Sequence, residues 1–94
     1  MDFESEKFGK CVLAELTQKQ MEDYARAMQG KGNEPLTVWR GESVRACVKL
    51  GLLLEPAWKQ PEDVDGAKPG HVYWLSECIV KWQTEALNID PLSS

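Results

Sequence analysis

PGHVYWLSECIVKWQTEALNI, residues 69–89, is the longest periodic run in the chain and decides its fold. At 100° per residue, one set of its apolar side chains falls within about 120° of helix surface. Pro69 suits a first helical turn because its missing N–H would be unpaired there, and Pro91 disfavours helix at the residue before it. A helix over about 69–89 is therefore predicted, with a core-facing stripe made of Val72, Leu75, Cys78, Ile79, Trp82 and Ala86.

A second apolar line runs along the same predicted helix. Tyr73, Val80 and Leu87 recur every seven residues, about 140° from the core-facing stripe, and Trp74 falls on the charged side of the helix. The N-terminal segment or the loop that carries Trp58 could cover this line. Alternatively, the line docks on another protein or on a second copy of the chain, since contiguous exposed apolar area usually marks an interface. The candidate partner-binding residues are therefore Tyr73, Trp74, Val80 and Leu87.

A shorter helix is predicted upstream, over about 18–29. Thr17 and Gln20 have the spacing of a capping box, in which each side chain bonds the backbone N–H of the other residue. Gly30 follows the periodic residues and can take the left-handed conformation that ends many helices. A further helix is predicted over about 38–50, capped by Thr37.

These elements predict a mainly α fold, a compact three-helix domain with a short N-terminal strand or extended segment at about 11–16. The alternative is an α+β fold, in which 11–16 pairs with the apolar run 52–54 in a small two-stranded sheet. A chain of 94 residues has the length of one domain, 1–94. Its polar ends, 1–8 and 91–94, are expected to be frayed.

Composition narrows the classes of function. The net charge of −4 repels a phosphate backbone at long range, which disfavours nucleic acid as a partner. No apolar run reaches the roughly 18–20 residues that cross a bilayer, and the first residues are acidic, so no membrane contact and a cytoplasmic location are expected. The three cysteines lie far apart among apolar neighbours and are expected to be buried free thiols: Cys11, Cys47 and Cys78.

The chain lacks the usual signatures of chemistry. It has one histidine and no C-x-x-C pair, so neither a metal nor a cofactor site is predicted. A cysteine nucleophile needs a nearby base, and His71 lies about 10 Å along the predicted helix from Cys78. No glycine-rich phosphate loop or isolated carboxylate pair occurs either. No catalytic residue is therefore assigned, and the protein is expected not to be an enzyme.

The pattern as a whole resembles small proteins encoded among the tail genes of long-tailed bacteriophages, some of which are tail-assembly chaperones. The segments that carry the resemblance are ELTQKQMEDYARAM (15–28), VWRGESVRACVKLGLL (38–53), DVDGAKPGHVYWLSECIVKW (63–82) and NIDP (88–91). The resemblance implies a phage or prophage protein that binds other tail proteins, among them the tape-measure protein, or itself, in the cytoplasm of the host cell.

Two other functions remain open. A small acidic inhibitor of a host nucleic-acid-processing enzyme would gather carboxylates on one face in place of phosphates, whereas here Glu22 has Arg26 four residues away. A small DNA-binding regulator would use the basic flank of Arg40, Arg45 and Lys49. A solvated helix face is the simpler explanation of that flank.

Overall fold

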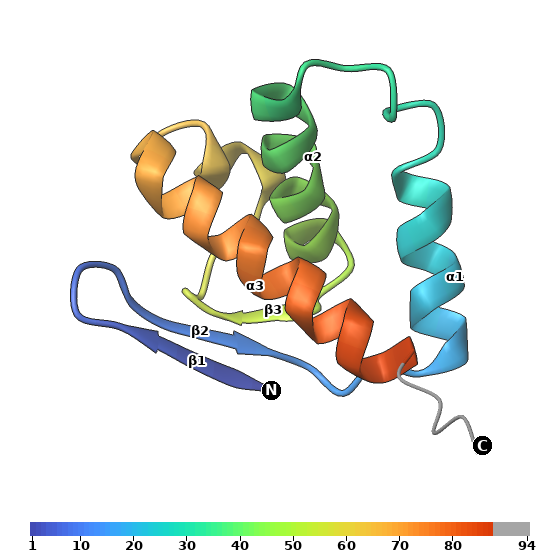
Figure 1. Cartoon of the computed structure of the whole chain (residues 1–94), viewed down its shortest axis with the longest axis horizontal. Helices are drawn as coiled ribbons and strands as arrows, with labels where there is room; N and C mark the ends of the chain where they lie inside the picture. Colours follow the sequence, from blue (N-terminus) through green and yellow to red (C-terminus); the bar gives the residue numbers. More distant parts are fainter. Residues whose placement is uncertain (88–94) are drawn as a thin grey trace.

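A three-stranded antiparallel sheet lies against a layer of helices in the computed structural model, which describes residues 1–87 (Figure 1). The strands follow the order β1-β2-β3 across the sheet, so β1 and β3 form its two edges. The longest helix, α3, crosses over the sheet and packs against both β2 and α2. In chain order the elements are β1 (Asp2–Ser5), β2 (Gly9–Leu13), α1 (Gln18–Ala27), α2 (Leu36–Lys49), β3 (Leu53–Glu55), the 3-10 turn η1 (Pro61–Val64) and α3 (Pro69–Leu87).

The sheet makes this an α+β fold, so the prediction of a mainly α fold is wrong. β2 pairs with β3, but β2 ends at Leu13 and the sheet has three strands rather than two. The third strand, β1, comes from the N-terminal residues that were expected to be frayed. Gly9 has a φ of 87°, which completes a tight turn, and the Ser5 hydroxyl accepts bonds from two backbone N–H groups in that turn. The hairpin then places Phe3 opposite the buried Cys11.

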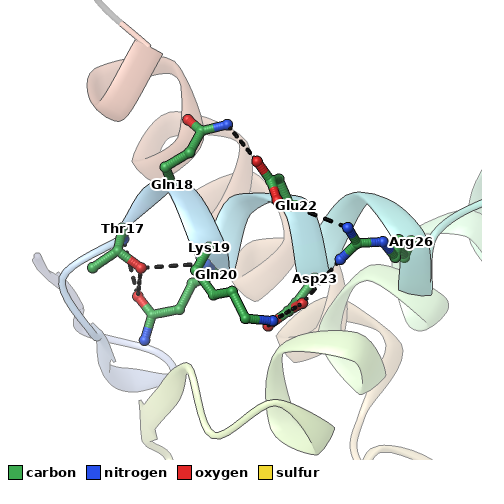
Figure 2. Close-up of polar contacts among 7 residues, drawn as sticks. All are labelled: Thr17, Gln18, Lys19, Gln20, Glu22, Asp23 and Arg26. Atoms are coloured by element: carbon green, nitrogen blue, oxygen red, sulfur yellow. Dashed lines mark hydrogen bonds and ion pairs between the residues drawn. The ribbon is translucent and has the colours of Figure 1, made fainter.

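The predicted capping box at the start of α1 is confirmed (Figure 2). The Thr17 hydroxyl accepts the backbone N–H of Gln20 at 3.2 Å, and the Gln20 side chain accepts the backbone N–H of Thr17 at 3.0 Å. The helix ends at Ala27, two residues earlier than predicted, and Gly30 has the expected positive φ of 82°. Each of the two bonds satisfies a backbone donor that helical pairing leaves free.

Replacing Thr17 by alanine removes the hydroxyl that caps α1. The free energy of unfolding is expected to fall by about 1 kcal/mol, the usual cost of losing such a cap. Chemical denaturation of the two proteins measures the difference. An unchanged midpoint would mean that this end of α1 is already open in the folded protein.

The second helix, α2, begins two residues before its predicted start. Pro35 precedes its first residue, and the Pro35 carbonyl accepts the backbone N–H of Trp39 at 2.9 Å. Thr37 therefore lies inside the first turn, and the prediction that Thr37 caps this helix is wrong. A proline immediately before the helix is favourable because it has no N–H to leave unpaired.

The core joins one face of each helix to the inner face of the sheet. In α3 the predicted stripe is largely confirmed: Leu75 and Ile79 have no exposed area, and Trp82 is 3% exposed. Val72 is half-buried. Ala86 is exposed because the sheet and α2 do not extend to the last turn of the helix. Residues 88 and 89 of the predicted helix, and the predicted frayed end at 91–94, lie outside the described residues.

Candidate protein-binding face

Three of the four candidate partner-binding residues are exposed on α3. Tyr73 is 53% exposed, Val80 39% and Leu87 59%. They lie seven residues apart, so consecutive members are about 10 Å apart along the helix and turned by only about 20°. Exposed apolar side chains at this spacing form one line on the side of α3 away from the core. We call Tyr73, Val80 and Leu87 the outer line.

Tyr73 is held in place by Arg40 of α2. The Arg40 guanidinium carbon lies 4.1 Å from the centre of the Tyr73 ring, a cation–π contact. Its Nη1 atom donates at 2.8 Å both to the Ser76 hydroxyl and to the Glu77 carboxylate. Arg40 is fixed at its far end by these two bonds, so it offers the tyrosine ring a defined contact. From the sequence, Arg40 was recognised only as part of a basic flank, and no signal linked it to Tyr73.

A groove of about 370 Å³ opens beside Tyr73, between α2, η1 and α3. Gly41 widens it, because a methyl group at that position would come within 3.1 Å of the Arg45 guanidinium. Arg45 is bound on both sides, by Asp65 at 2.6 Å and by Glu42 at 2.8 Å. The residues that line the groove are Thr37, Arg40, Gly41, Arg45, Val64, Asp65, Pro69, Val72 and Tyr73.

Trp74, the fourth candidate residue, is partly buried by the turn between β1 and β2. The ring of Phe8 lies 6.1 Å from that of Trp74 and stacks on His71 at 5.2 Å with an angle of 4°. The ring of Trp58 lies 5.5 Å from that of His71 in an edge-to-face contact. Trp74 is therefore part of an aromatic cluster that fastens the hairpin to α3, and it does not extend the outer line. Both segments that were considered as covers in the sequence, the N-terminal segment and the loop that carries Trp58, contribute a ring to this cluster.

The aromatic cluster predicts a pH dependence of stability. Burial lowers the pKa of His71 below its ordinary value of 6.5. Between that lowered pKa and 6.5 the folded protein binds fewer protons than the unfolded chain, so stability is expected to rise with pH in this window and to fall as the solution is acidified. Urea unfolding at a series of pH values measures the slope. His71→Phe, which keeps a ring against Phe8, should flatten the slope, and a slope unchanged by this replacement would assign the effect to other groups.

A smaller groove of about 250 Å³ lies between the edge strand and α3. Phe3 lines it from β1, on the same side of the sheet as the buried Cys11. The helix side includes Val80 of the outer line. Its full lining is Met1, Phe3, Val80, Lys81, Thr84 and Glu85.

The three cysteines are buried in the core and show no sign of catalytic or metal-binding chemistry within residues 1–87. The three thiols are free and buried, as predicted. Burial raises the pKa of Cys47 to about 12, and burial together with the neighbouring Cys78 raises the pKa of Cys11 well above its usual range. Such thiols stay protonated and are poor nucleophiles. Within residues 1–87, no group of three or more histidine, cysteine or acidic side chains is placed to hold a metal ion.

Several charged side chains of α1 and α2 are paired with one another. On α1, Lys19 bonds Asp23 at 3.0 Å, and Arg26 lies 3.8 Å from Glu22 (Figure 2). On α2, Arg40 and Arg45 are occupied by the carboxylates described above. The acids of α1 are therefore interleaved with cations, and two of the three cations in the basic flank are neutralised.

Comparisons with protein-family models, with curated proteins and with solved structures found no match to this chain. No helix among the described residues has the length and apolar character needed to cross a membrane.

Proposed function

We propose that this protein acts through contact with other proteins, and that the outer line of α3 is part of the contacting surface. The observation that carries the proposal is the exposure of Tyr73, Val80 and Leu87 on a helix whose opposite face forms the core. A surface helix gains nothing for folding from apolar side chains in water. Rigid aromatic and aliphatic side chains of this kind supply much of the binding energy at protein interfaces.

For the partner we propose other phage or prophage tail proteins, with a chaperone-like role in the cytoplasm of the host cell. The resemblance of residues 15–91 to tail-region proteins supports this assignment. A tape-measure protein is the best candidate, because a long apolar chain must be kept from aggregating before it assembles. Exposed aliphatic and aromatic side chains can bind such a chain with little sequence preference.

The charge pairing favours this proposal over the other two functions. An acidic inhibitor needs carboxylates free on one face, whereas those of Glu22 and Asp23 are close to cations. A DNA-binding regulator needs free cations, whereas Arg40 and Arg45 are bound to carboxylates. Neither function has a surface in the described residues that supports it as directly as the outer line supports protein binding.

Co-expression with the tape-measure protein of the same phage or prophage tests the proposal. The measurement is the fraction of tape-measure protein that remains in the supernatant. Wild-type protein is expected to raise that fraction, and Leu87→Glu is expected to abolish the gain. Leu36→Glu is the matched control, because Leu36 is exposed to the same degree, 62% against 59%, but lies on α2. The proposal would be contradicted if wild-type protein does not raise the soluble fraction of tape-measure protein. It would also be contradicted if Leu87→Glu and Leu36→Glu lower that fraction equally.

A further inference from the structure

Within residues 1–87, no strand pairs with the outer edge of β1. Met1 and Leu13 exchange both backbone bonds, with N···O distances of 2.7 and 2.9 Å. Such pairs alternate along an antiparallel ladder, so Phe3 and Ser5 also direct their N–H and C=O groups toward β2. The backbone groups of Asp2 and Glu4 then point away from the sheet. They are available to a further strand.

The other edge of the sheet is less suitable. β3 has three residues, and Pro56, which has no N–H, follows its last residue. β1 has four residues and contains no proline. An added strand therefore fits beside β1.

The two faces of β1 have different chemistry. Asp2 and Glu4 carry carboxylates that are 78% and 75% exposed on the side of the sheet away from α3, and each has one cation of this chain at 3.9 Å, the N-terminal amine and Lys10 respectively. Exposed ion pairs of this length contribute little to stability, so both carboxylates can still bind the cations of a partner. Phe3, between them, faces α3 and lines the groove of about 250 Å³ that also includes Val80. Side chains alternate between the two faces of a strand. In a strand added beside β1, two alternate side chains would therefore lie against the two carboxylates, and the side chain of the residue between these two would enter the groove.

We propose that β1 binds an extended protein segment as a fourth strand, and that this segment has basic residues alternating with an apolar one. Backbone bonds to Asp2 and Glu4 supply the alignment, the carboxylates select lysine or arginine, and the groove accepts one aliphatic or aromatic side chain. The inference rests on the proposed function, because it specifies the kind of partner segment that the protein contacts.

The charges of β1 disfavour a second copy of the same strand as the occupant. Antiparallel pairing centred on Phe3 would place Asp2 of one copy opposite Glu4 of the other, and like charges in that position repel. Moving the register by one residue would instead place Glu4 opposite Phe3, on the apolar side of the sheet. A basic segment avoids both costs.

A peptide of alternating lysine and valine tests the inference, with affinity measured by calorimetry at low salt. The control peptide has the same composition with its lysines and valines in two blocks. Glu4→Pro and Glu4→Ala both remove the charge, but only proline removes the N–H that points outward. Glu4→Pro is expected to bind the alternating peptide about tenfold more weakly than Glu4→Ala does, the effect of one lost hydrogen bond. Equal affinities for the two variants, or for the two peptides, would overturn the inference.

A charge reversal keeps the test decisive if proline disrupts the hairpin. The double variant Asp2→Lys, Glu4→Lys is expected to lose the lysine–valine peptide and to bind a glutamate–valine peptide instead. Glu34→Lys, at an exposed position in the loop before α2, is the matched control and should keep the wild-type preference. An unchanged preference in the double variant would also overturn the inference. If the peptides do not bind as expected but Leu87→Glu still lowers the soluble fraction of the tape-measure protein, only the strand inference is contradicted and the proposed function stands.

Discussion

Replacing Trp82 by alanine is expected to lower the free energy of unfolding by about 3–5 kcal/mol, the usual cost of truncating a buried tryptophan. The side chain is 3% exposed, and its indole Nε1 donates to the Ala14 carbonyl at 2.8 Å. That bond joins α3 to the segment that leaves β2, so the replacement leaves both a cavity and an unpaired carbonyl. The loss is a large share of the roughly 5–15 kcal/mol that stabilises an ordinary domain. Urea unfolding followed by far-ultraviolet circular dichroism measures it.

Trp82→Phe separates the two contributions. Phenylalanine keeps most of the buried area but cannot donate to Ala14, so a smaller loss of about 1–3 kcal/mol is expected. A loss below about 1 kcal/mol for Trp82→Ala would contradict the position of this side chain in the core.

Leu75→Ala is the second replacement with a large expected effect. Leu75 has no exposed area and lies in the part of α3 that packs on α2 and the sheet, so a loss of about 2–5 kcal/mol is expected. Leu75→Met conserves volume and should cost less than about 1.5 kcal/mol. Denaturation of both variants provides the comparison. Similar small losses would mean that the surrounding core is loose enough to close over the missing side chain.

The helices could be predicted from the sequence because their signals are local. The capping box at Thr17, the positive φ at Gly30 and the start of α3 at Pro69 each depend on residues within one or two turns. The periodicity of α3 also identified Leu75, Ile79 and Trp82 as core. Its extension to Ala86 failed because periodicity shows which face is apolar but not how far the covering elements extend.

The sheet could not be predicted with the same certainty because it depends on contacts between distant segments. β1 has one apolar residue between two acids, which reads as a polar, frayed end. Its position is set by the turn at Gly9, by pairing with β2 and by the Phe8 cluster on α3. None of these contacts has a signal within β1 itself.

The candidate site could be predicted only in part, because some of its contacts also join distant segments. The seven-residue spacing identified Tyr73, Val80 and Leu87, which are exposed. It could not show that Phe8 covers Trp74, since the two residues come from segments that meet only in the folded protein. The contact of Arg40 with Tyr73 depends in the same way on the packing of α2 against α3.

The free energy of unfolding of Val80→Glu tests the two-sided character of α3 most directly. Val80 is 39% exposed in the middle of the outer line, one residue from the buried Ile79 and two residues from the buried Trp82. If the outer line is surface, Val80→Glu should unfold within about 0.5 kcal/mol of wild type, as surface replacements usually do. A loss of about 3 kcal/mol or more, comparable to that of Trp82→Ala, would show that Val80 belongs to the core and would contradict the outer line as a binding surface.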